Sequence, residues 1–348
     1  MKANLAFLLI GLVGCAADPG PTGDDDGGDD APPFTNGVST LAGAGEPGFV
    51  DGPRGTSRFA NPVNVAYAPD GMLYVADFDN NKVRVVDPDD GTTTTLVDQA
   101  GFKRPFAFAF DDGIMYVSTD DDPAGGHNLM SGTIWRVDTG TGEATVIAEN
   151  IGRPRGMAVL PDGRIAFSDY MHHVVQLLDP ATGLVTPLAG TWDVKGMVDG
   201  VGGKFSTPYG IATINGELLV ADFDNNRVRV VTLDGTVSTY AGAGTAGFQD
   251  GSMSAAQFDR PQGMVATSAG VFVTDLGNYR IRKLSGDGVM TVAGSGAGGY
   301  LDSDDKLAAQ FYGLEGMSAT PDGSMLFVAD GGRGENVPYN RVRSIKIN

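Results

Sequence analysis

Apolar and polar residues alternate along most of this chain in short runs, and polar turns separate the runs. One stretch shows the pattern: residues 64–68 precede a Pro-Asp-Gly turn, and residues 72–76, 83–86 and 93–97 follow it. A two-residue period bounded by Asp-Gly turns predicts half-buried antiparallel strands. We therefore expect an all-β fold from residue 37 to residue 348.

The second run of that stretch recurs six times as an apolar segment that ends in a polar residue. The copies end at Asp77, Thr119, Asp169, Asp222, Asp275 and Asp330, in steps of 42, 50, 53, 53 and 55 residues. A period in this range indicates stacked copies of a unit that cannot bury its apolar face alone. Four antiparallel strands per copy, six times over, predict a six-bladed β-propeller.

The ends of the repeat array also predict how the ring closes. The last repeat has three strand-like runs and stops at Asn348, whereas an unpaired run, residues 37–42, stands before the first repeat. This run matches the fourth runs of later repeats at 235–241 and 288–293. We expect it to join the last blade, which would remove an exposed sheet edge.

The longer pattern around each repeat resembles the NHL repeat. Residues 241–251 read Ala-Gly-Ala-Gly-Thr-Ala-Gly-Phe-Gln-Asp-Gly, and Phe258-Asp-Arg-Pro-Gln-Gly and Val273-Thr-Asp-Leu-Gly-Asn-Tyr-Arg-Ile-Arg follow. The similarity covers roughly residues 38–348, but blades two and three have short connections into their first strands. The resemblance implies an NHL-type propeller. It does not imply one biochemical activity, because repeat scaffolds carry many.

The N-terminus predicts a secreted, anchored protein. A short apolar run, residues 5–13, is too short to span a bilayer and has the length of a signal peptide's core. Leu12-Val-Gly-Cys15 resembles the lipobox of bacterial lipoproteins, which implies lipidation of Cys15, the one cysteine of the chain. We expect a signal peptide at 1–14 and a protein anchored by lipid in the bacterial cell envelope. Ala16 after the cysteine favours the outer membrane.

Composition and charge exclude some classes of binding partner. Residues 15–36 contain six aspartates with Pro and Gly and are expected to form an acidic disordered tether. The net charge of −19 argues against nucleic acid, and we expect membrane contact through the N-terminal lipid only. We expect a monomer whose partner is a protein or a small-molecule ligand.

Two recurring motifs have structural interpretations. The segments Asp77-Phe-Asp-Asn-Asn and Asp222-Phe-Asp-Asn-Asn begin like a calcium loop, but Lys82 and Arg227 stand where such a loop needs glycine. We interpret them as turns whose acids pair with recurring arginines, namely Arg84, Arg229, Arg282 and Arg343. The G-x-G-x-x-G segments that start at residues 43, 242 and 294 are interpreted as tight turns rather than a dinucleotide fingerprint, because no helical pattern follows them.

The candidate binding residues are those that begin the six inner strands, because they should ring one mouth of the channel. They differ between repeats, whereas the framework positions do not, and four of the six are polar: Val63, Phe106, Arg155, Tyr209, Gln262 and Glu315. Five of them, without Val63, form the predicted ligand site. A solvated rim without a ligand is the alternative.

A metal site is a second possibility at the same mouth. His127, His172, Asp120 and Asp169 lie in turns of blades two and three and could hold a divalent ion such as calcium or zinc. No cofactor is certain from the sequence. The favoured function is a ligand- or protein-binding module without catalysis. The alternative is a metal-dependent hydrolase or lyase acting at the channel mouth, like the lactonases, strictosidine synthase-like proteins or the peptide-amidating lyase with which six-bladed propellers share a fold.

Overall fold

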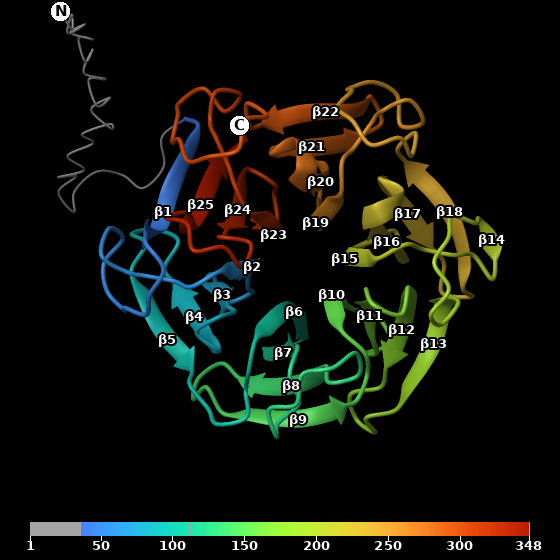
Figure 1. The fold of residues 1–348 in the computed structure, drawn as a ribbon, viewed down its shortest axis with the longest axis horizontal. Coiled ribbons are helices and arrows are strands. Elements are labelled where there is room, and N and C mark those ends of the chain that lie inside the picture. Colours follow the sequence, from blue (N-terminus) through green and yellow to red (C-terminus); the bar gives the residue numbers. More distant parts are fainter. Residues whose placement is uncertain (1–35, 112, 348) are drawn as a thin grey trace, which may run out of the picture. The chain divides into compact units, whose positions relative to one another are not determined.

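The computed structural model describes residues 36–111 and 113–347. Six antiparallel sheets follow one another around a central axis in chain order (Figure 1). The predicted all-β, six-bladed propeller is therefore confirmed. The predicted signal peptide, Cys15 and the acidic tether as far as residue 35 lie outside the described residues. Within those residues, no helix is long and apolar enough to cross a membrane.

Each blade has an inner strand beside the axis and three strands outside it. Blade one is β2 (Pro62–Tyr67), β3 (Leu73–Asp77), β4 (Lys82–Val86) and β5 (Thr93–Val97). Blade two is β6 (Pro105–Asp111), β7 (Ile114–Thr119), β8 (Thr133–Asp138) and β9 (Ala144–Glu149). Blade three is β10 (Pro154–Val159), β11 (Ile165–Asp169), β12 (Val174–Leu178) and β13 (Val185–Gly190).

The other three blades follow the same order, with one extra strand. Blade four is β15 (Pro208–Ile214), β16 (Glu217–Asp222), β17 (Arg227–Val231) and β18 (Thr236–Ala241), and β14 (Gly200–Val201) pairs with its edge. Blade five is β19 (Pro261–Thr267), β20 (Gly270–Asp275), β21 (Arg280–Ser285) and β22 (Gly288–Ala293). Blade six is β23 (Leu314–Ala319), β24 (Met325–Asp330), β25 (Asn340–Lys346) and β1 (Val38–Gly45).

The ring closes as the sequence predicts. β1 pairs antiparallel with β25, with Val38 opposite Ile345 and Ala42 opposite Val342 (Figure 1). Leu41 and Ala42 are fully buried and pack in one cluster with side chains of blade one. The N-terminal strand thus completes the last blade and contributes to its contact with the first.

Faces of neighbouring blades pack through recurring phenylalanines. Each of five connections into an inner strand carries one phenylalanine that is at most 1% exposed, namely Phe59, Phe102, Phe205, Phe258 and Phe311. Burying such a side chain contributes about 1.5–3 kcal/mol. The repeated Phe of the sequence pattern therefore packs the blades together and does not contribute to a site.

The recurring acids and arginines form the predicted framework pairs. In blade one, Arg84 Nη1 lies 2.8 Å from Asp77 Oδ2, and both side chains are fully buried. Asn80 Nδ2 donates to the same carboxylate, while Asn81 adopts a left-handed backbone, and its Oδ1 accepts from the Arg104 amide of the next blade. The turn interpretation is confirmed. The same ion pair recurs in three other blades as Asp222–Arg229, Asp275–Arg282 and Asp330–Arg343.

Blades two and three depart from this framework. In blade two the ion pair is replaced by a neutral hydrogen bond, 2.9 Å long, from Trp135 Nε1 to Thr119 Oγ1. In blade three Asp169 contacts His172 instead, and Gln176 stands at the arginine position. The two blades with short connections, residues 98–104 and 150–153, are therefore also the two that lack the charged pair.

Glycine-rich segments form turns before the inner strands. Gly242 and Gly244 have φ angles of 107° and 85°, which only glycine adopts without strain. No α-helix follows them within residues 36–111 and 113–347, where the helical elements are the short 3₁₀ turns η1 (Phe223–Asn225) and η2 (Leu276–Asn278).

Candidate ligand site at the channel mouth

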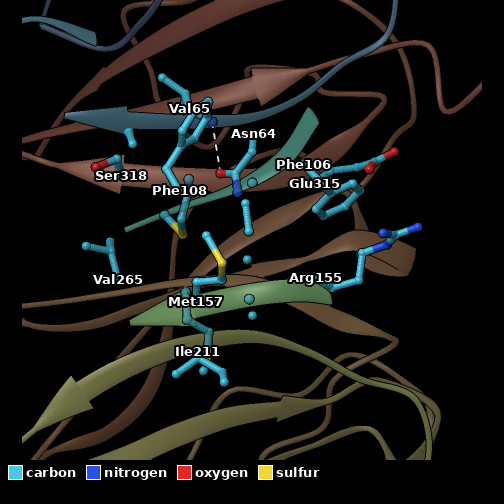
Figure 2. A pocket seen from close by; sticks show the side chains of 18 of the residues that line it. Asn64, Val65, Phe106, Phe108, Arg155, Met157, Ile211, Val265, Glu315 and Ser318 are labelled. Atoms are coloured by element: carbon cyan, nitrogen blue, oxygen red, sulfur yellow. Dashed lines mark hydrogen bonds between the residues drawn. The ribbon is translucent and has the colours of Figure 1, made fainter. Parts of the chain in front are cut away.

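The five residues of the predicted ligand site line a single cavity of about 210 Å³ on the propeller axis. Each stands at the second position of its inner strand, so the six-fold arrangement brings side chains from five blades to one mouth. Figure 2 shows Phe106, Arg155 and Glu315 at one end of this cavity. The set is Phe106, Arg155, Tyr209, Gln262 and Glu315.

Blade one contributes a different residue from the one that begins its strand pattern. Val63 is buried in the core between the first three blades, and Asn64 lines the cavity instead. Asn64 Oδ1 accepts from the Val65 amide at 2.9 Å (Figure 2). Val63 stands at the second position of β2, as the sequence predicts for a ring residue, but it is 2% exposed and does not line the cavity.

Glycines form the next layer of the channel. A Cβ on Gly210 would stand 2.3 Å from the Gln262 carbonyl oxygen, and one on Gly156 would stand 2.5 Å from the Tyr209 carbonyl oxygen. Inner strands of neighbouring blades therefore approach each other too closely for a side chain at these two positions. The close approach fixes the positions of the residues directly above it.

Below the glycines the channel is apolar. One side chain from each inner strand lines it, namely Val65, Phe108, Met157, Ile211, Met264 and Met317. Figure 2 shows Val65, Met157 and Ile211 away from the end that carries Arg155 and Glu315. The cavity thus combines a polar mouth with an apolar interior, the usual composition of a small-molecule pocket.

Arg155 is held in a fixed position by ionic and aromatic contacts. Its Nη2 donates to Asp120 Oδ2 at 2.9 Å, and its Nη1 contacts the other oxygen of the same carboxylate. The guanidinium carbon lies 4.1 Å from the Phe106 ring centre and 4.3 Å from that of Tyr170. Burial tends to raise the pKa of Asp120, but Arg155 and Arg153 outweigh that effect and lower it. Asp120 therefore stays ionised and orients Arg155.

Aromatic rings from blades two to four form one wall of the mouth. The Tyr209 ring centre lies 6.5 Å from that of Phe106, 5.2 Å from that of Tyr170 and 4.8 Å from that of Phe223. Burial raises the pKa of Tyr209 to about 12, against the lowering effect of Arg155, so its hydroxyl stays protonated at neutral pH. The wall offers ring faces and the Tyr209 hydroxyl to a ligand.

Glu315 and Gln262 lie at the same mouth on blades six and five. Gln262 is buried, Glu315 is half-buried, and Gln262 Nε2 stands 3.5 Å from Glu315 Oε2. Burial raises the pKa of Glu315 to about 7, although the charge of Arg155 acts in the opposite direction. Glu315 can therefore exchange a proton near neutral pH.

The four predicted metal ligands are not brought together. Asp120 is occupied by Arg153 and Arg155, and Asp169 Oδ2 contacts His172 Nδ1. His127 contacts Asp121 instead of either predicted acid. Across residues 36–111 and 113–347, no three His, Cys, Asp or Glu side chains are grouped to hold a metal ion. The proposed set divides into separate pairs because the nearby arginines and the fold of each turn take up its acids.

The pairing of Asp120 with Arg155 was not found from the sequence, which proposed Asp120 as a metal ligand. Asp120 lies in the long segment 120–132, whose conformation the repeat pattern does not specify. The recurring Gly-Met pairs at 156–157, 263–264 and 316–317 were a usable signal for the apolar interior. Each methionine stands two residues after a mouth residue, and side chains two residues apart on a strand point to the same side. The pattern therefore indicates that three methionines face the channel.

Comparisons with known proteins agree with this fold. No family model matches the chain. The protein SUPPRESSOR OF QUENCHING 1, chloroplastic, of Arabidopsis thaliana is 28% identical over 286 residues, which are 70% of this chain and 27% of that protein. NHL repeat-containing protein 2 of Bos taurus is 34% identical over 88 residues, 25% of this chain and 12% of that protein. The chain thus spans about a quarter of the first relative's length and about an eighth of the second's.

Solved structures match over most of the chain. A protein of unknown function from Bacteroides thetaiotaomicron superposes with a TM-score of 0.72 at 21% identity, covering 90% of this chain and 76% of that one. An auxiliary nutrient binding protein from the same organism gives 0.69 at 19% identity, covering 88% and 75%. A gluconolactonase from Xanthomonas campestris gives 0.57 at 14% identity, covering 89% of each chain. At these identities the likeness shows the fold alone. The chain is a six-bladed β-propeller with NHL repeat-containing relatives.

Proposed function

We propose that this protein is a binding module that takes a small organic ligand at the mouth of the propeller channel. The observation that carries the proposal is the single cavity lined by side chains from all six blades, with a polar and aromatic mouth above an apolar interior. Rings, a fixed guanidinium and a few convergent polar groups are the usual sources of small-ligand affinity and specificity. The nutrient binding protein of the same fold is consistent with this proposal.

The enzymatic alternative has less support. A metal-dependent hydrolase or lyase needs several protein ligands around an ion at the mouth, and the described residues offer no group of three. Arg155 and Asp120, which could otherwise act on a substrate, neutralise each other. The gluconolactonase of the same fold contributes no argument about activity at 14% identity.

The proposed location is the bacterial cell envelope, with the propeller anchored through lipid on Cys15, most consistently in the outer membrane. The support is the lipobox-like sequence at residues 12–15. Replacing Cys15 with Ser should move the protein from detergent-soluble membrane fractions to the soluble or unprocessed pool. Processed protein that still partitions with membranes would contradict the anchor.

The binding proposal is tested with a defined mixture of free amino acids, amines, sugars and nucleosides. Saturation-transfer NMR would identify the compounds that contact the purified protein. The variant Tyr209→Ala removes the ring at the centre of the aromatic wall and should weaken any retained compound at least tenfold. Thr145→Ala, on the exposed face of outer strand β9, is the matched control and should change nothing. Equal binding to the parent protein, Tyr209→Ala and Thr145→Ala would show that the ligand binds elsewhere.

A further inference from the structure

Glu315 differs from the fully buried acids of the blades. Six carboxylates in the described blades are at most 1% exposed and each contacts an arginine or a histidine, namely Asp77, Asp120, Asp169, Asp222, Asp275 and Asp330. Glu315 forms no ion pair with any described residue, and its side-chain hydrogen bond is the long one from Gln262. A partly buried carboxylate without a cation is costly. The arrangement therefore leaves a place for a positive charge.

The nearest candidate within the protein does not fill that place. Arg155 shares the mouth with Glu315, but both of its terminal nitrogens bind Asp120, and its guanidinium is packed between Phe106 and Tyr170. Rotating Arg155 toward Glu315 would break two charge-assisted hydrogen bonds and two ring contacts. Arg333, after β24, also acts on Glu315 through its charge, but it forms no ion pair with Glu315 among the described contacts. A ligand can therefore supply the direct ionic contact that Glu315 lacks.

The surroundings favour an organic cation over a metal ion. A hard metal ion needs several oxygen ligands or a hydration shell, whereas this mouth has aromatic rings on one wall and methionine and isoleucine side chains below it. An ammonium group needs one carboxylate and can also interact with ring faces such as those of Phe106 and Tyr209. An apolar substituent on the ammonium matches the interior, which a hydrated ion does not.

We propose that the ligand is a small primary amine with an apolar substituent, whose ammonium binds Glu315 and whose substituent enters the channel toward Met157, Met264 and Met317. This proposal rests on the proposed function. Met317 lies two residues beyond Glu315 on β23, about 7 Å along the strand. A chain of about six carbon atoms would span that distance, and the cavity of about 210 Å³ has room for it.

The charged groups around Glu315 determine how binding should depend on pH. Burial has the largest effect on the pKa of Glu315 and raises it. Arg155 on β10, Arg333 after β24 and the hydrogen bond from Gln262 on β19 lower it, whereas Asp79 after β3 raises it. The net pKa is about 7. The amine needs the ionised carboxylate. Affinity should therefore be full at pH 8 and about 30-fold lower at pH 5.5, because tenfold is lost per pH unit below the pKa.

The experiment uses three probes with one chain length and different head groups: hexylamine, hexanol and hexanoate. Isothermal titration calorimetry at pH 8 should give hexylammonium at least tenfold tighter than hexanol, with hexanoate weakest. Glu315→Gln keeps the shape of the side chain and should lose at least tenfold for hexylammonium while leaving hexanol unchanged. Glu335→Gln is the control, because Glu335 is an exposed acid of the same blade that bonds the Tyr312 hydroxyl.

The outcomes separate this inference from the binding proposal itself. Equal affinity of the Glu315→Gln variant and the parent protein for hexylammonium would overturn the proposal that the ligand is an amine. Tighter binding of hexanoate than of hexylammonium would overturn it as well. If hexanol binds as tightly as hexylammonium and Tyr209→Ala weakens both, the mouth remains the site and the amine class is wrong. If none of the probes binds, the amine is also wrong, and the defined mixture then decides separately whether the mouth binds anything.

Discussion

At the scale of single residues, the acids of the propeller framework and the acid Glu315 of the channel mouth differ in whether an arginine pairs with them. Framework acids such as Asp275 are fully buried but contact an arginine, so their charges are compensated within the blade. Glu315 is left without such a contact among the described residues and carries a raised pKa. A locally unfavourable group at the mouth of a cavity is typical of a functional position, because binding a ligand can relieve it.

Replacing Glu315 with Gln should stabilise the unliganded protein at high pH. The pKa of Glu315 rises from 4.5 to about 7 on folding, so the folded state binds more protons between these values and stability falls as pH rises through that window. The neutral glutamine avoids this loss. Urea unfolding should show a gain of about 3 kcal/mol at pH 8 and none at pH 4. The same gain at both pH values would show that Glu315 is not strained by its charge.

Disrupting a framework ion pair should lower the free energy of unfolding more than disrupting its neutral replacement in blade two. Asp275→Ala leaves Arg282 buried with one exposed acid, Asp250, as its remaining ionic partner, and should cost about 3 kcal/mol. Thr119→Val in blade two removes two neutral hydrogen bonds, one from Trp135 and one to the Asp121 carbonyl, and should cost about 2 kcal/mol. Guanidinium chloride midpoints of the two variants would measure the difference. Equal shifts would mean that the ion pair contributes nothing beyond ordinary hydrogen bonds.

At the scale of elements, the blades are built alike and their connections differ. Strand positions were predictable because a two-residue period and Asp-Gly turns determine each hairpin locally, as in residues 64–76. The pairing of β1 with β25 was predictable from one unmatched run at each end. The contact of Arg155 with Asp120 was not, because it depends on how the segment 120–132 folds over a neighbouring blade. The burial of Val63 likewise reflects core packing rather than pattern.

The closing strand provides a prediction about connectivity. Lys346 donates its amide to the Gly37 carbonyl at 3.1 Å, so a short turn could join β25 directly to β1. A circular permutant that begins near residue 46 and carries residues 37–45 after residue 347 should melt within a few degrees of the parent protein. Deleting residues 31–44 without restoring them should expose the edge of β25 and lower the melting temperature or cause aggregation. The same melting temperature for the permutant and the deletion variant would contradict the role given to β1.

At the scale of the whole molecule, the fold supplies a rigid ring and the mouth supplies specificity. Inner-strand glycines let the blades approach closely, which fixes the mouth residues in place before a ligand arrives. The sequence predicted this mouth because its residues vary where the framework does not. It could not predict which of them are neutralised inside the protein, since that depends on partners far away along the chain, such as Asp120 for Arg155.

The most direct test of the account is whether a ligand reaches the inside of the channel. Labelling the methionine methyl groups with ¹³C gives reporters within the cavity at Met157, Met264 and Met317, and one on the exposed face of outer strand β22 at Met290. Compounds of the defined mixture that bind should shift the three channel signals and leave Met290 in place. Shifts at Met290 or other surface methionines, with the channel signals unmoved, would contradict a binding site at the channel mouth.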